Sequence, residues 1–136
     1  MKFPLQLAAI VLCGGALIYV LLDWLGGRAE LQDPALLTPV EWGQQLVESR
    51  GCTACHSLDG RKGIGPSWYD AWGSERLLQD GRTVVVDAAY LRRAMVDPAG
   101  ELVAGYDPVM LPSAFTEEEM EAVLALIRGL GTAPGL

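Results

Sequence analysis

The pattern of hydrophobic and polar positions divides this chain of 136 residues into an apolar N-terminal run and a longer mixed part. From Leu5 to Leu22, all but two positions are apolar or glycine, and Trp24 and Leu25 extend the run. A helix needs about 20 mostly apolar residues to cross a bilayer. The pattern therefore predicts a single transmembrane anchor in residues 1–25.

A cleaved signal peptide is the rival interpretation of this run. Its basic region would be Lys2 alone, its apolar region would be too long, and no small-residue cleavage site follows. A lipoprotein signal fits poorly, because Leu12 precedes Cys13 where a small residue is expected. The positive charge of Lys2 favours a cytoplasmic N-terminus, which places the rest of the chain on the periplasmic side of the inner membrane.

Residues 26–37 are expected to link the anchor to one domain of residues 38–136, since Gly26-Gly27 and Asp33-Pro34 interrupt any regular element. About 100 residues are a common size for one domain.

The start and stop signals of three helices follow in the mixed part. Thr38 and Glu41 form a capping box around Pro39, which predicts a helix toward Arg50 that stops at Gly51. A second helix should begin after Asp87 and reach Val96, because Asp97-Pro98 ends it. The third should begin at the capping box Thr116–Glu119 and end near Gly129. Its apolar face carries Met120, Val123, Leu124 and Ile127.

A short β-hairpin is expected between the first two helices. Residues 77–79 and 82–85 flank Asp80-Gly81, which is a two-residue hairpin signal.

The chain is acidic, with 17 Asp and Glu against 10 Lys and Arg and a formal net charge of −7. Such a charge disfavours nucleic acid as a partner, and it can steer a basic patch of a partner protein. Solubility alone would explain the same charge.

The stretch Cys52-Thr53-Ala54-Cys55-His56 carries the chemistry. C-x-x-C-H is the attachment signature of a c-type haem, in which two thiols bind the vinyl groups and the imidazole binds iron. Structural zinc needs four N or S ligands, but His56 is the only histidine and Cys13 the only other cysteine. A thioredoxin-like dithiol would need a βαβ context, which is absent here. One covalently bound haem c, held by Cys52, Cys55 and His56, is therefore the predicted cofactor.

The order of these parts resembles a class I cytochrome c over residues 38–131. The stretches that carry the resemblance are Gly51–Gly60, Gly65-Pro66, Gly73–Arg76, Asp80-Gly81, Asp87–Arg92, Asp97-Pro98, Gly105–Met110 and Glu117–Glu119. The chain is similar to the cytochrome c domain fused to subunit II of some bacterial haem-copper oxidases. This chain departs from it by lacking a copper-binding domain and by having Leu111 between Met110 and Pro112. The resemblance implies an all-α class I cytochrome c fold around one covalent haem, with the short hairpin inserted and one N-terminal transmembrane helix.

The second axial ligand is expected to be Met110, which lies 54 residues after His56 in a proline-flanked loop. Met95 and Met120 are the competitors, but each shares a helical face with apolar residues, so core packing explains them better.

Other site residues follow from the resemblance alone. The Pro66 carbonyl is expected to accept a hydrogen bond from the His56 ring. Trp72, Arg76 and Tyr106 are expected near the haem propionates. Trp68 and Tyr69 are expected to line the haem crevice, although core packing explains them equally well.

These features predict an electron-transfer protein that is not itself an enzyme and has no small-molecule substrate. We expect it to be a subunit of a respiratory or photosynthetic membrane complex and to exchange electrons with other redox proteins. A free-standing tethered shuttle and a ligand-binding haem sensor or peroxidase are the alternatives.

Overall fold

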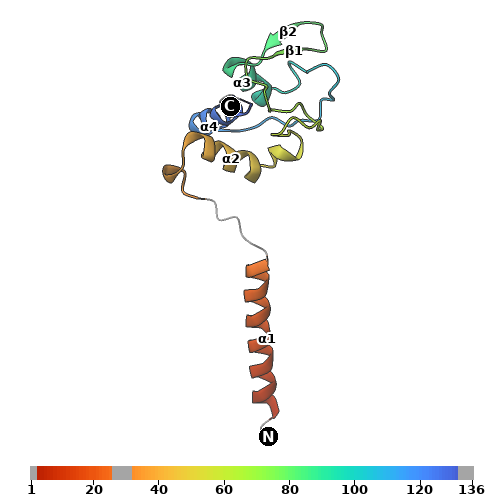
Figure 1. The fold of residues 1–136 in the computed structure, drawn as a ribbon. Helices are drawn as coiled ribbons and strands as arrows, with labels where there is room; N and C mark the ends of the chain where they lie inside the picture. The colour runs from red at the N-terminus through yellow and green to blue at the C-terminus, as the bar shows by residue number, and fades with distance from the viewer. Residues whose placement is uncertain (1–2, 26–31, 132–136) are drawn as a thin grey trace. The chain divides into compact units, whose positions relative to one another are not determined.

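The computed structural model describes residues 3–25 and 32–131 (Figure 1). The chain divides into two compact units, Met1–Leu31 and Gln32–Leu136, and each is described by itself.

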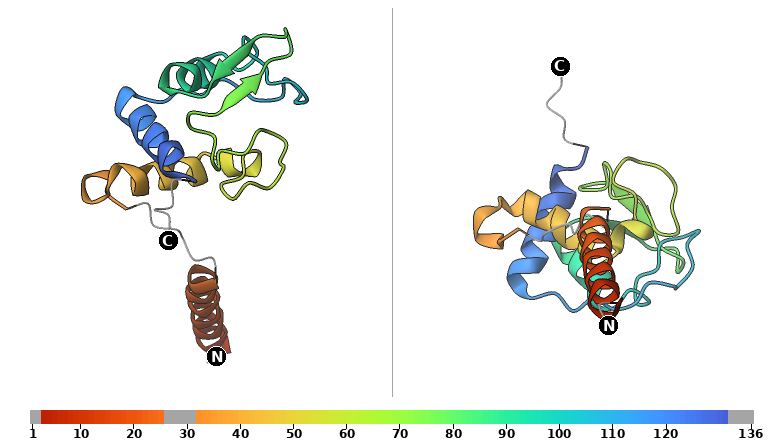
Figure 2. Two further views of the ribbon diagram at one scale, coloured as in Figure 1. Left: turned by 45° about the horizontal axis from the view of Figure 1, so that its top comes forward. Right: turned by 90° about the horizontal axis from the view of Figure 1, so that it is seen from below.

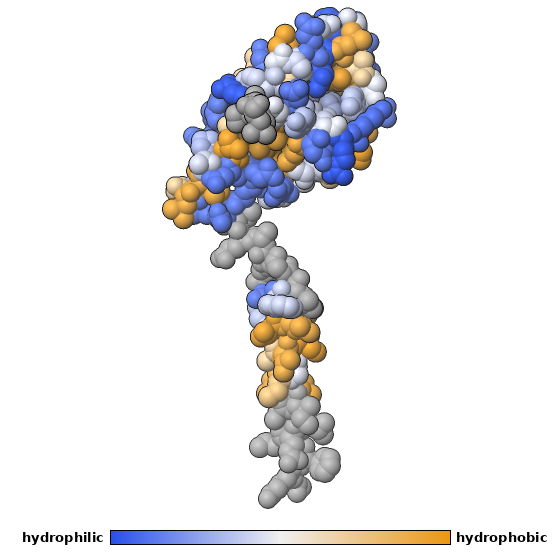
Figure 3. All heavy atoms as spheres, viewed as in Figure 1, coloured by the Kyte–Doolittle hydropathy of each residue, from blue (hydrophilic) through white to orange (hydrophobic). Residues whose placement is uncertain are grey.

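The described residues of the first unit form the helix α1 (Phe3–Leu25). Its side chains from Val11 to Trp24 are exposed, and most of them are apolar (Figure 3). Pro4 lies in the first turn, where proline is tolerated, and no later proline interrupts the helix. Among the residues that the structure describes, no helix combines the length and hydrophobicity that a membrane span requires.

The second unit is mostly helical and contains the three helices that the sequence predicts. They are α2 (Pro39–Ser49), α3 (Ala88–Val96) and α4 (Glu117–Gly129), with 3₁₀ turns η1 (Pro34–Leu36) and η2 (Cys52–Ala54). Both predicted capping boxes are present: Thr38 and Thr116 accept from the backbone N–H three residues later, and the glutamates there accept from the cap N–H. The Asp87 side chain accepts a hydrogen bond from Tyr90 N–H, and α3 begins after Asp87 as expected.

The packing of α2 against α4 forms the centre of this unit, and Figure 2 shows the two helices crossing. Gly43 permits the close approach, because a Cβ there would collide with the Ala122 carbonyl. Val47, Val123 and Ile127 are fully buried at this contact. Because this crossing fixes where α2 ends, it also fixes the position of Cys52.

The predicted β-hairpin around Asp80-Gly81 is confirmed, but its turn is longer than the two residues expected. The antiparallel strands are β1 (Glu75–Leu77) and β2 (Thr83–Val85), and Leu77 pairs with Thr83, so five residues connect them. The physical reason is competition from a distant segment: Gln79 N–H donates to the Leu102 carbonyl, and Leu78 forms a bridge with Val103. Gln79 therefore does not pair with Arg82, as a two-residue turn would require, and instead Leu78 N–H donates to the Arg82 carbonyl at 2.8 Å across the longer turn.

Residues 32–37 of the predicted linker lie in the second unit, whereas residues 26–31 lie outside the described residues. The backbone of Gln32 exchanges two hydrogen bonds with the side chain of Gln45, at 2.8 and 3.0 Å. Asp33 then caps the η1 turn. This part of the predicted linker is attached to α2.

Candidate functional site

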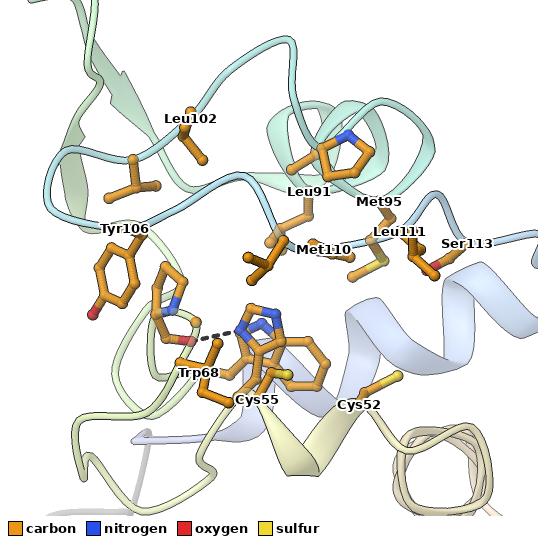
Figure 4. A pocket seen from close by; sticks show the side chains of 18 of the residues that line it. Cys52, Cys55, Trp68, Leu91, Met95, Leu102, Tyr106, Met110, Leu111 and Ser113 are labelled. Carbon is orange, nitrogen blue, oxygen red and sulfur yellow. Dashed lines mark hydrogen bonds between the residues drawn. The ribbon is translucent and has the colours of Figure 1, made fainter.

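A cavity of about 550 Å³ lies in the second unit, and Figure 4 shows it from close by. Its volume falls in the range of about 300–1,000 Å³ that is usual for cofactor and ligand pockets. Most of the wall is apolar and includes Ile64, Leu91, Ala94, Met95, Leu102 and Val109. The site can therefore hold a large, mainly apolar group away from water.

The two cysteines lie together on one wall of the cavity. Gly51, with φ of +73°, ends α2 and turns the chain into η2. The N–H groups of Cys55 and His56 both donate to the Cys52 carbonyl, at 3.1 and 3.0 Å, which presents the motif as one compact turn. Both thiols are free and half-buried, and burial raises the pKa of the Cys52 thiol. Two neighbouring thiols at the edge of one cavity match the attachment chemistry that the motif predicts.

His56 is held in one orientation by three neighbours. Its Nδ1 lies 2.8 Å from the Pro66 carbonyl oxygen, which can only accept, so Nδ1 carries the proton and Nε2 is the unprotonated nitrogen. The imidazole stacks on Trp68 with ring centroids 4.8 Å apart and planes 8° apart. On another side, a Cβ at Gly65 would come within 2.5 Å of Cε1, so only glycine leaves room for the ring.

The protonation state of His56 suits a metal ligand. Burial lowers the pKa of the imidazole below its ordinary value, and the hydrogen bond to Pro66 opposes this effect. The neutral ring thus keeps a lone pair on Nε2, the form in which histidine binds metals.

Two methionines line the side of the cavity opposite the cysteines (Figure 4). Met110 comes from the loop before α4 and is 37 % exposed, whereas Met95 comes from α3 and is 4 % exposed. Met120 is not among the cavity-lining residues and is buried in α4. Of the two competitors of Met110, Met120 therefore does not line the cavity, whereas Met95 does.

The residues expected near the propionates fall into two groups. Arg76 and Tyr106 line the cavity, but Trp72 does not. Trp72 packs against the core, and the Arg128 guanidinium lies 4.3 Å above its ring.

The two crevice residues also differ. Trp68 lines the cavity and is buried, whereas Tyr69 is 47 % exposed and is not part of the wall.

The polar residues that line the cavity and that sequence reasoning missed include Arg50, Tyr90 and Glu101. Glu101 pairs with Arg93 at 2.9 Å and with Arg82 at 3.4 Å. Burial is the main cause that raises the pKa of Tyr90, and the Glu101 carboxylate is the next largest cause. The helical spacing of Tyr90, Leu91, Ala94 and Met95 was the available signal for the α3 wall. For Arg50 and Glu101 no local signal exists, because their neighbours are distant in sequence.

These residues fit a covalently attached haem. The site offers two thiols, an imidazole with a free Nε2, a thioether across the cavity, apolar walls, and Arg76 with Tyr106 as polar groups for carboxylates. Each is a group that this cofactor uses.

Comparison with known proteins agrees with the geometry. The model of the cytochrome c family matches residues 40–131, which is most of the chain. A search of curated proteins found no match. The chain therefore belongs to the cytochrome c family, whose domains bind covalently attached haem c for electron transfer, and Cys52, Cys55 and His56 supply its attachment motif.

Proposed function

We propose that this protein is a membrane-anchored one-electron carrier of a respiratory or photosynthetic chain, with His56 and Met110 as the axial ligands of its haem. One observation carries the proposal: Cys52, Cys55 and His56 share one wall of a single cavity, and Met110 lies across from them (Figure 4). His56 and Met110 would together supply both protein ligands of the iron and leave no position for a substrate, which favours electron transfer over catalysis.

When bound, the haem supplies a reversible one-electron change at its iron. The chain's own residues keep the surroundings constant during that change. Pro66 holds the proton on Nδ1 of His56, and Trp68 and Gly65 fix the plane of the ring. The apolar walls exclude water, which is one of the levers by which a protein sets the potential of a haem.

A redox partner is expected to dock at the rim of the cavity. Three cavity-lining residues are also strongly exposed: Ile64 and Val109 at 60 % and Leu111 at 81 %. Exposed apolar groups that gather at one site mark contact surfaces. We therefore expect Leu111→Glu to slow reoxidation of the reduced protein by membranes of its source organism. Leu36→Glu is the matched control, because Leu36 is 82 % exposed but does not line the cavity. Equal rates in the two variants would exclude docking at this rim.

Electron transfer and ligand binding are distinguished by carbon monoxide. Because Met110 is expected to occupy the sixth position, the reduced protein should not bind carbon monoxide at neutral pH. Ready binding, seen as a shift of the Soret band, would favour a haem sensor or peroxidase instead.

Membrane anchoring by residues 5–25 is supported by the apolar sequence and by the exposed apolar side chains of α1. The protein should remain with membranes through an alkaline carbonate wash and need detergent for release. A chain that begins at Gln32, the first residue of the second compact unit, should appear in the soluble fraction with its haem. Release of the full chain by carbonate would show that residues 5–25 are not an anchor.

Membership in a larger complex is tested by extraction in mild detergent, followed by mass spectrometry of the subunits that migrate with the protein. We expect redox subunits of a respiratory or photosynthetic complex, with the haem domain on the periplasmic side. Migration of the protein alone would indicate a free tethered shuttle and would contradict the subunit assignment.

A further inference from the structure

Arg50 connects the attachment motif to the far side of the cavity. It caps the C-terminal end of α2, two residues before Cys52, and its guanidinium contacts Ala114, Phe115 and Glu119. Nη1 donates to the Ala114 carbonyl at 2.9 Å, and Nη2 donates to the Glu119 carboxylate at 2.5 Å. The Cζ atom lies 4.6 Å from the centre of the Phe115 ring. A single side chain therefore joins α2 to the chain that leads into α4.

One of these partners, Glu119, is itself held in place by α4. Glu119 also accepts a hydrogen bond from Thr116 N–H at 2.9 Å in the capping box of α4, and its side chain is only 18 % exposed. Arg50 is 38 % exposed, but its bond is charge-assisted and its partner is partly buried, which makes it stronger than an ion pair between two exposed side chains. Arg50 is thus bound to a carboxylate, that of Glu119, whose position is fixed by the capping box of α4.

The peptide group that Arg50 holds lies at one end of the Met110 segment, which we define as residues 107–112. At that end, Ser113 N–H donates to the Met95 carbonyl at 2.8 Å, next to the Ala114 carbonyl held by Arg50. At the other end, the Gln79 side chain donates to the Tyr106 carbonyl at 2.8 Å. Because both ends are fastened, the segment can place Met110 reproducibly across the cavity.

We propose that Arg50 is a positioning residue that keeps the Met110 segment closed over the haem. The proposal rests on the assignment of Met110 as the second axial ligand. Loss of the Arg50 contacts should let the segment open more often, so that an external ligand replaces the thioether more easily.

Arg92 offers a matched control. It pairs with Glu117 and Glu121 on the same helix α4, but those side chains are 71 % and 64 % exposed, and Arg92 does not line the cavity. Changing Arg92 therefore removes an arginine–glutamate contact to α4 without touching residues 113–115.

The test uses the full-length holoprotein and imidazole as the probe ligand. We expect Arg50→Met to bind imidazole to the ferric haem about tenfold more tightly than wild type, as the loss of one charge-assisted hydrogen bond allows. Arg92→Met should match wild type. Arg50→Lys should be intermediate, because an ammonium keeps the charge but not the planar fork that reaches both partners. Equal affinity in Arg50→Met and Arg92→Met would overturn the proposal.

Two further variants keep the result decisive. If Arg50→Met does not accumulate with haem, Glu119→Gln preserves a capping-box residue but removes the charge of the partner. It should increase imidazole affinity in the same direction, and no increase would overturn the proposal. Met110→Ala should bind imidazole most tightly of all. If it does not, the ligand assignment fails and this inference falls with it. If it does while Arg50→Met is unchanged, only the role of Arg50 fails.

Discussion

The imidazole of His56 lies parallel to the indole of Trp68, with the ring centroids 4.8 Å apart and the planes within 8°. This stack joins the attachment motif to the core, because Trp68 is 7 % exposed and packs in the same cluster as α2 and α4. The orientation of the haem ligand is therefore tied to the packing of the whole unit.

Replacing Trp68 should therefore weaken both the packing of the unit and the orientation of His56. We expect Trp68→Leu to lower the free energy of unfolding by about 2–4 kcal/mol, since it removes a buried indole and its aromatic contact. The midpoint potential should also shift, because the His56 ring loses one of its supports. Tyr69→Leu is the control: Tyr69 is 47 % exposed and should cost less than about 1 kcal/mol. Denaturant unfolding and redox titration of the two variants provide the measurement, and similar losses in both would contradict the stack's role.

Gly65 is expected to be intolerant of a side chain because of its distance from His56. A Cβ there would lie 2.5 Å from Cε1 and 2.8 Å from Nδ1, so Gly65→Ala should turn the ring and disturb its bond to Pro66. The yield of haem-loaded protein should fall and its potential should change. Gly129→Ala, in α4 with no atom within 4 Å of the new Cβ, should keep the wild-type yield and potential. Normal ferric and ferrous spectra in Gly65→Ala would show that the ring has more room than the structure indicates.

Covalent attachment predicts a simple chemical result. Haem should stay with the wild-type protein through acid–acetone extraction, because Cys52 and Cys55 each form a thioether bond. Cys52→Ala and Cys55→Ala should each retain at most one bond and yield less haem-loaded protein. Complete transfer of the wild-type haem into acetone would contradict attachment.

Tyr90 predicts a loss of stability at high pH. Burial first, and the Glu101 carboxylate second, raise the pKa of Tyr90 in the folded protein, while Arg76 and Arg93 oppose this. Above the unfolded value of about 10, the unfolded chain releases the phenol proton more readily than the folded one, so stability falls as pH rises. Tyr90→Phe should therefore lose less stability than wild type between about pH 9.5 and 11. Guanidinium unfolding at a series of pH values measures this difference, and parallel curves for the two proteins would contradict it.

The parts of the structure that local signals determine were predictable from sequence. The capping boxes at Thr38 and Thr116 placed the starts of α2 and α4, because both partners of each box lie within four residues. The hairpin was also predicted at the right place, but its turn is longer than expected because Leu78 and Gln79 pair with residues 102–103, an interaction that no short window contains.

In the candidate site, too, the residues with local sequence signals were predicted and those placed by the tertiary fold were not. The motif residues and Pro66 come together as expected, and Met110 lies across from them. Arg50 and Glu101 were missed, since a surface arginine and glutamate have no distinctive pattern in sequence. They reach the cavity only through the tertiary fold.

The identity of the second axial ligand is the claim on which most of the account depends, since both Met110 and Met95 line the cavity. The direct measurement is the midpoint potential, together with the long-wavelength band of the thioether–iron bond, in wild type, Met110→His and Met95→Leu. The account predicts that Met110→His keeps its haem, loses the band and falls in potential by on the order of 100 mV or more, because axial ligands are the main determinant of haem potential. Met95→Leu should keep both the band and the potential close to wild type. Loss of the band in Met95→Leu, with a larger shift in potential than in Met110→His, would contradict the assignment.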